Sequence, residues 1–140
     1  MIAAAAPASA IEIRPAWPED QAFVAATFAD QLARGNHRDG NALADRVLDA
    51  SSTKVLVAVD PNQGGKIVGW LAYAAIPRVR AVLFAYVRAP RRLSGVAKQL
   101  ADAAWPARKG AWVHAGLRGS ATRSLLARFP ATEVKLEELL

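Results

Sequence analysis

The residues with the clearest chemical potential lie in one short stretch, Arg88 to Lys98, which reads RAPRRLSGVAK. The basic pair Arg91 and Arg92 stands directly before Leu93, Ser94 and Gly95. Serine is a good N-cap residue, and the first N–H groups of a helix carry partial positive charge without an intrahelical partner. A glycine there lets a ligand approach the main chain closely. The stretch therefore predicts an anion site at a helix start, most naturally for a phosphate or pyrophosphate.

Few other side chains suit catalysis. His37 and His114 are the two histidines, and a free imidazole with a pKa near ~6.5 suits proton transfer, although a lone histidine is more often structural. Tyr73 and Tyr86 are the two tyrosines. The chain has no cysteine, which excludes a disulfide framework, a thiolate nucleophile and a thiolate metal site. The sequence shows no metal-ligand cluster, so no metal is expected.

The composition indicates one folded domain. The 140 residues are 53% hydrophobic and 21% charged, which is enough apolar material for a core and argues against disorder. Residues 1–10 read as a loose alanine-rich leader and residues 11–140 as a single domain. No apolar run approaches the ~20 residues that span a bilayer, so no membrane is expected. The lack of cysteine fits a reducing cytoplasm.

The net charge of +6 is concentrated in the middle of the chain. Residues 61–132 carry twelve basic side chains and one acid, Asp102, whereas residues 1–60 carry five basic and eight acidic side chains. A strongly positive segment favours an anionic partner. The phosphates of a cofactor and nucleic acid are two candidates, and a solvated basic surface is the alternative without a function.

The first half of the chain predicts two helices and three strands. Residues 11–14 alternate apolar and polar side chains and read as a strand. Pro18 opens a helix that Gly35 ends, and a second helix covers residues 41–50. Residues 54–59 and 66–76 are rich in strand formers and form an antiparallel hairpin around the turn at residues 60–65.

The second half predicts a central strand at residues 80–88, buried on both faces. A helix over residues 95–105 follows, with an inward face of Val96, Leu100, Ala103 and Ala104. Residues 111–115 return as a parallel strand through a right-handed crossover. Ser120 caps a last helix that runs to Phe129, and residues 132–136 form an edge strand. The four tryptophans are expected in the core or on a cleft wall.

These elements give the order β-α-α-β-β-β-α-β-α-(β). The segment from Arg92 to Ala97 resembles the R/Q-x-x-G-x-G/A signature of the GNAT superfamily of acyl-CoA N-acyltransferases. Ile13-Arg14-Pro15-Ala16 with Pro18-Glu19-Asp20 is similar to that family's first strand and helix entry. The resemblance covers residues 11 to about 130. It implies an α/β fold with a mixed, mostly antiparallel sheet and helices on both faces, acetyl-CoA as co-substrate, and an amine acceptor.

The resemblance also implies how the cofactor is held. Main-chain N–H groups from Arg92 to Ala97, including those of Leu93, Ser94, Gly95 and Val96, would bind the pyrophosphate. The main chain of Tyr86 and Val87 would pair with the pantetheine arm as an added strand does. Arg91 or Lys98 would pair with a phosphate. Leu93 departs from the family's usual small residue, and Ala97 is an accepted variant of the final glycine.

The proton-transfer residues of the family have no clear counterpart. Many members use a carboxylate on the central strand as general base, but no acid lies between Asp60 and Asp102. His114 is the first substitute. The family's general acid is often a tyrosine in the last helix, where this chain has Leu125 or Leu126. Tyr73, on the strand beside the central one, is the alternative.

Three hypotheses follow. The first is an N-acyltransferase that moves an acetyl group from acetyl-CoA to an amine by direct transfer, and members of this kind often form homodimers. The second is a GNAT-fold module that binds acyl-CoA without catalysis. The third is a basic nucleic-acid-binding protein, which is less favoured because aromatic side chains are not interleaved with the basic ones.

Overall fold

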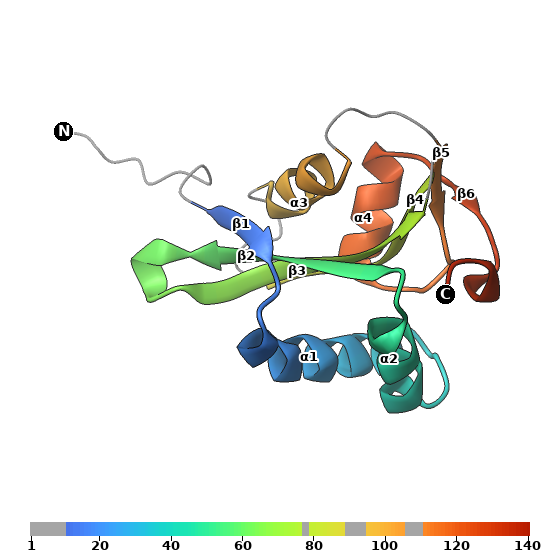
Figure 1. The fold of residues 1–140 in the computed structure, drawn as a ribbon, viewed down its shortest axis with the longest axis horizontal. Helices are drawn as coiled ribbons and strands as arrows, with labels where there is room; N and C mark the ends of the chain where they lie inside the picture. The colour runs from blue at the N-terminus through green and yellow to red at the C-terminus, as the bar shows by residue number, and fades with distance from the viewer. Residues whose placement is uncertain (1–10, 77–78, 89–94, 106–110) are drawn as a thin grey trace.

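A six-stranded sheet organises the computed structural model, which describes residues 11–76, 79–88, 95–105 and 111–140 (Figure 1). In sheet order the strands are β1 (Glu12–Pro15), β2 (Thr53–Asp60), β3 (Lys66–Ile76), β4 (Val79–Val87), β5 (Ala111–His114) and β6 (Thr132–Glu133). The pairs from β1 to β4 are antiparallel, whereas β5 pairs parallel with both β4 and β6. The predicted mixed, mostly antiparallel sheet is confirmed.

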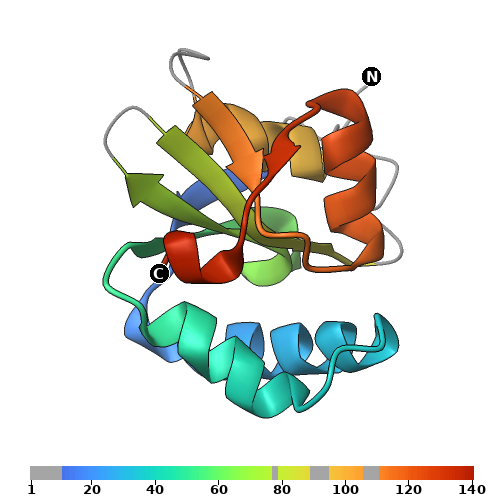
Figure 2. The same ribbon diagram turned by 90° about the vertical axis from the view of Figure 1, so that its right-hand side faces the viewer.

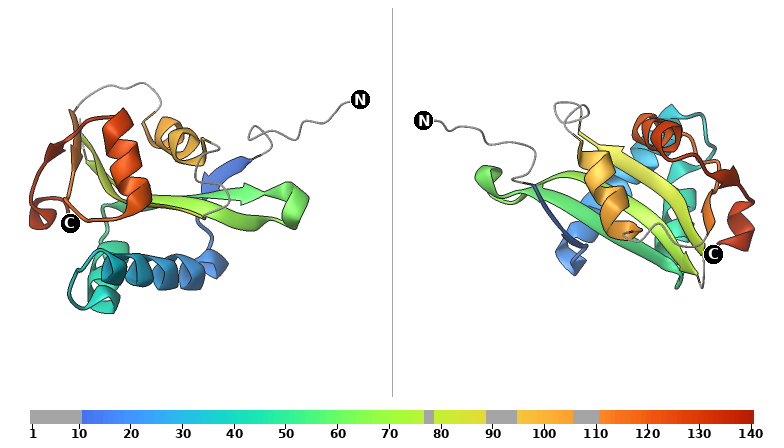
Figure 3. Two further views of the ribbon diagram at one scale, coloured as in Figure 1. Left: turned by 180° about the vertical axis from the view of Figure 1, so that it is seen from behind. Right: turned by 90° about the horizontal axis from the view of Figure 1, so that it is seen from above.

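Helices cover both faces of this sheet. The helices α1 (Gln21–Arg34) and α2 (Gly40–Asp49) lie on one face, and α3 (Val96–Ala104) and α4 (Ser120–Arg128) lie on the other (Figures 1 and 3). Short 3-10 turns occupy Pro18–Asp20, Pro61–Gln63 and Leu136–Glu138. The element order agrees with the prediction. Within the described residues, no helix has the length and apolar character needed to cross a membrane.

An aromatic cluster fixes α1 to the middle of the sheet. The Phe28 ring is fully buried, with its centroid 4.9 Å from that of Phe84 and 5.3 Å from that of Trp70. The indole N–H of Trp70 donates to Thr27 Oγ1 over 2.8 Å, so the polar edge of this buried ring is satisfied. The cluster therefore holds β3 and β4 rigidly against α1.

A second apolar cluster fills the opposite face. Val68, Leu71 and Val82 from the strands pack with Val96 and Leu100 from α3, and all five are buried. Because the sheet is covered on both faces, its central strands are apolar in both directions rather than alternating. This is the pattern from which the central strand was predicted.

Two tryptophans join three elements near one end of the sheet. Trp105, directly after α3, stacks on Trp112 of β5 with ring centroids 4.5 Å apart and ring planes 2° apart. The Trp112 indole N–H donates to the carbonyl of Phe129, directly after α4, over 3.0 Å. The stack thus links α3, β5 and α4.

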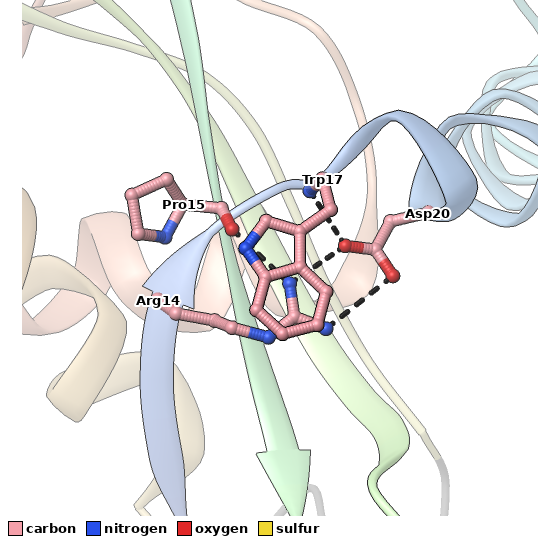
Figure 4. Close-up of polar contacts among 4 residues, drawn as sticks. All are labelled: Arg14, Pro15, Trp17 and Asp20. Atoms are coloured by element: carbon pink, nitrogen blue, oxygen red, sulfur yellow. Dashed lines mark hydrogen bonds and ion pairs between the residues drawn. The ribbon is translucent and has the colours of Figure 1, made fainter.

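The turn from β1 into α1 is built on one charged side-chain pair (Figure 4). Arg14 donates to the two carboxylate oxygens of Asp20 over 2.7 and 3.4 Å, and the Trp17 main-chain N–H donates to the same carboxylate over 2.7 Å. The hydrogen bond from Arg14 lowers the pKa of Asp20, although burial opposes this shift. The Arg14 guanidinium also lies 3.5 Å from the centre of the Trp17 ring. These contacts hold the entry into α1.

Four details correct the sequence-based expectations. Trp17 is 50% exposed, because its ring lies over Arg14 at the surface rather than in the core. In α3, Ala101 is buried and Ala103 is exposed, since the helix turns its Ala101 side toward the sheet. Gly119, and not Ser120, is the N-cap of α4. The last strand ends at Glu133, where the chain turns toward a 3-10 segment.

Candidate active site

The strands β4 and β5 pair over only part of their lengths. All of β5 pairs with Val79–Val82, and the last contact is the Ala115 N–H donating to the Val82 carbonyl over 3.3 Å. Beyond Val82, the rest of β4 has no strand partner on this side among the described residues. Figure 2 shows the two strands side by side. This gap in the strand pairing is called the opening below, although neither Ala85 nor Val87, which lie along it, is without a partner.

The register shows which main-chain groups face this opening. The Arg88 N–H donates to the Val68 carbonyl of β3 over 2.8 Å. Because main-chain groups alternate along a strand, those of Tyr86 also face β3, and those of Ala85 and Val87 face the opening. The register thus divides the predicted pantetheine pair, with Val87 on the open side and Tyr86 within the β3–β4 ladder.

The hydroxyl of Thr122 in α4 occupies part of the opening. Thr122 Oγ1 accepts from the Ala85 N–H over 2.9 Å and donates to the Ala85 carbonyl over 3.3 Å. The residue is only 3% exposed. Next to it, Gly119 passes so close to the Phe84 ring that a side chain at position 119 would overlap it. The start of α4 thus serves as a substitute for the missing strand beside β4.

The start of α3, where the sequence predicts an anion site, begins with a glycine in an unusual backbone conformation. Gly95 adopts the left-handed conformation with φ 82° and ψ 12°, and no atom lies within 4 Å of the position that a side chain would take. Val96 is buried beneath it and Ala97 is half-buried. Lys98 forms an ion pair with Asp102 over 2.8 Å, so a phosphate would compete for it. Arg91, Arg92, Leu93 and Ser94 lie outside the described residues.

The two predicted proton-transfer residues share one row across the sheet. Val82 pairs with Tyr73 on one side and with His114 on the other. With strands about 4.8 Å apart, the main chains of Tyr73 and His114 are separated by roughly 10 Å, so the pair does not act as a hydrogen-bonded unit. His114 lies where β5 leaves β4, and Glu133 pairs with it from β6.

Both histidines already accept main-chain hydrogen bonds. The Gly116 N–H donates to His114 Nδ1 over 3.0 Å, which leaves the proton of neutral His114 on Nε2. The Arg118 N–H donates to His37 Nε2 over 2.9 Å. Burial, together with the charge of Arg118, lowers the pKa of His37. In these arrangements His114 is a hydrogen-bond donor at Nε2, and base action at Nδ1 would require its bond to Gly116 to break.

Comparison with solved structures identifies the architecture. One similar structure is a ribosomal-protein-alanine N-acetyltransferase from Brucella melitensis biovar Abortus 2308, with 24% identity, coverage of 89% of this chain and 93% of that chain, and a TM-score of 0.55. Another is described as an acetyltransferase of the GNAT family from Desulfovibrio desulfuricans, with 17% identity, coverage of 86% and 83%, and a TM-score of 0.57. The chain has the GNAT fold. No protein-family model and no curated protein matches the sequence.

A third similar structure with the GNAT fold was solved with ligand. The aminoglycoside N-acetyltransferase AAC(6')-Iy, in complex with a CoA bisubstrate analogue, has 17% identity, coverage of 89% of this chain and 92% of that chain, and a TM-score of 0.58. At these identities the likeness concerns the fold alone.

Sequence reasoning about this GNAT fold missed one residue of the site. Thr122 lies one turn before Leu125, the position compared with the family's tyrosine, and it contacts the open edge of β4. A β-branched hydroxyl residue on the apolar side of a short helix, three positions before a buried leucine, was the signal that could have found it. Within the described residues, no group of three or more potential metal ligands lies together.

Proposed function

We propose that this protein is an N-acetyltransferase that transfers the acetyl group of acetyl-CoA directly to an amine. The observation that carries the proposal is the left-handed Gly95 at the start of α3, which follows a β4 end that no described strand covers on one side. The helix start offers N–H groups to a phosphate. An extended ligand that pairs with β4 would replace the present contacts of Ala85 and Val87. The CoA ligands of a GNAT-fold relative lend further support.

In this proposal the cofactor runs along the α3 side of the opening. The pyrophosphate lies on the N–H groups from Arg92 through Leu93, Ser94, Gly95 and Val96 to Ala97, with Arg91 or Lys98 beside it. The pantetheine arm follows Tyr86 and Val87, and of the two it is Val87 whose main-chain groups lie on the side of β4 away from β3. The thioester then lies near Ala85, where Thr122 is the neighbouring hydroxyl.

The reaction itself requires little from the protein. The amine attacks the thioester carbonyl, a C–N bond forms, the C–S bond breaks, and the amine proton is lost to water or base. Holding the two reactants together can supply roughly 7–11 kcal/mol in ideal cases. In the proposal His114 stabilises the departing thiolate with a hydrogen bond from its Nε2–H, and the thiolate takes its proton from water. Tyr73, one strand further away, is the second candidate donor.

A module that binds acyl-CoA without catalysis is the second candidate function. Two observations favour it: the His114 Nδ1 lone pair is already engaged, and Thr122 already satisfies Ala85. The two functions differ in turnover. Release of free CoA in the presence of a broad panel of amines, with matching acetylated products, would support the transferase and exclude the module.

The test of the cofactor site is thermal unfolding with and without acetyl-CoA. A ligand at 100 times its dissociation constant adds about 2.7 kcal/mol to stability, which should raise the Tm by roughly 10 °C. Gly95→Glu should abolish the rise, because a carboxylate then stands at the phosphate position. Gly64→Glu is the matched control, since Gly64 also has a positive φ of 70° and no neighbour within 4 Å. An equal rise in both variants would refute the assignment.

A further inference from the structure

A basic cavity lies between the end of α1 and the start of α4. Its volume is about 420 Å³. It is lined by Gln31, Arg34, Asn36, Arg118, Ser120 and Arg123, together with two glycines. The described residues of its lining therefore include three arginines and no carboxylate. A cavity of this composition favours an anion over a cation or a neutral ligand.

The walls of the cavity are tied together at one side. Arg118 Nε donates to the Gly35 carbonyl over 2.7 Å, and the Arg118 N–H donates to His37 over 2.9 Å. The Gly35 backbone lies so close to Arg118 that a side chain at position 35 would stand 2.6 Å from the Arg118 carbonyl oxygen. These contacts fix the loop after α1 against the segment before α4, so the cavity is preformed.

The three arginines differ in how fully they are engaged. Arg34 forms an ion pair with Asp30 over 2.9 Å, but both side chains are well exposed, and such pairs contribute little. Arg118 uses only its Nε in the bond to Gly35, which leaves its terminal nitrogens for a ligand. Arg123 is exposed, and its guanidinium makes no hydrogen bond or ion pair with a described residue. Arg118 and Arg123 are thus the cationic groups best able to bind an anion.

One wall of the cavity belongs to the segment that packs on β4. Its Gly119 wall packs on Phe84, and Thr122, one turn into α4, bonds to Ala85. In Figure 2, the first turn of α4 is the part of that helix nearest to α1, and the helix axis runs away from α1. The cavity therefore lies on the α1 side, behind the α4 residues that contact β4, whereas Gly95 and the start of α3 lie on the other face. An acceptor held in the cavity would reach Ala85 by passing Gly119 and Thr122.

We propose that this cavity binds the acidic group of the acceptor, and that the acceptor is an amine carrying a carboxylate or a phosphate. The proposal rests on the proposed function, since it places the acceptor opposite acetyl-CoA. Arg118 and Arg123 hold the acid, and the amine extends toward Ala85. The nitrogen then forms the new C–N bond as the C–S bond breaks, and its proton passes to water.

The test uses two pairs of amines that differ by one acidic group. Phosphoethanolamine is compared with ethanolamine, and β-alanine with propylamine, by titration into the full chain while the amide NMR signals of Gly35, Gly119 and Ser120 are followed. Each acid-bearing amine should bind at least about tenfold more tightly than its neutral counterpart. The two pairs separate a phosphate acceptor from a carboxylate acceptor, and acetylation of the same amines is then measured by mass.

A charge-removing variant checks the site. Arg123→Gln should weaken binding of the acid-bearing amine about tenfold and raise its KM, with the thermal shift by acetyl-CoA unchanged. Arg128→Gln, an exposed arginine on the same helix outside the cavity, should have no effect. Equal binding of all four amines, or an unaffected Arg123→Gln variant, would overturn the inference alone. Anion binding in a protein that gives no acetyl-CoA shift would overturn the acceptor role together with the proposed function.

Discussion

Replacing Thr122 by valine tests whether α4 completes the open edge of β4. The change keeps the volume of the side chain but removes both hydrogen bonds to Ala85, at 2.9 and 3.3 Å. With Thr122 only 3% exposed, water cannot take the place of the hydroxyl. Leaving a buried main-chain group without a partner costs about 1–3 kcal/mol. We expect a loss near ~2 kcal/mol, which corresponds to a Tm lower by roughly 6–10 °C for a domain of this size.

Two measurements test whether the Thr122 hydroxyl is the hydrogen-bond partner of Ala85. Urea unfolding gives the loss of stability, and amide hydrogen exchange reports on the Ala85 N–H itself, which should exchange much faster in Thr122→Val. Thr122→Ser is the matched control, because it loses a methyl group yet keeps the hydroxyl and therefore the protection of Ala85. If Thr122→Val were within about 0.5 kcal/mol of the parent protein and Ala85 remained protected, the hydroxyl would not be its partner.

Two further predictions concern pH. Because the pKa of His37 is lowered in the folded state, its contribution to stability is complete above the unfolded pKa of about 6.5 and declines as the pH falls below that value. The free energy of unfolding in urea should therefore differ less between pH 8 and pH 5.5 in His37→Gln than in the parent protein. The glutamine amide oxygen can still accept from the Arg118 N–H. The lowered pKa of Asp20 gives a contribution that is complete above about pH 4 and is lost as the pH falls through the folded-state pKa. Asp20→Asn should remove this loss of stability between pH 6 and pH 3. Asp30→Asn, which changes an exposed ion pair, should keep it. Equal curves of unfolding free energy against pH for the two variants would contradict the role of Arg14.

The sequence predicted the order of elements well because local signals were strong. Lys66–Ile76 was predicted with both ends correct, since a glycine turn precedes it and a proline follows it. Gly35 ends α1 as expected. What failed depended on tertiary contacts. Nothing local shows that Arg14 draws the Trp17 ring to the surface, or that α3 turns Ala101 toward the sheet.

The part of the candidate site that depends on local sequence signals could be predicted. The glycine at the start of α3 is a local feature, and Gly95 has the left-handed conformation. The assignment of Tyr86 to the open edge could not be checked from sequence, because the side of the strand depends on the register with β3. The contact of Thr122 with Ala85 joins residues 37 apart, and the arginine cavity joins Gly35 and Arg118, which are 83 apart, so only the folded chain brings these groups together.

The stacked indoles of Trp105 and Trp112 have an optical consequence. Two parallel chromophores with centroids 4.5 Å apart couple their electronic transitions, and the coupling fades quickly as the rings separate or rotate. Because Trp112 is also bonded to the end of α4, the pair is a built-in reporter of how α3, β5 and α4 are assembled. The near-ultraviolet circular dichroism of the unlabelled protein should therefore register movement of the three elements around the open β4 edge.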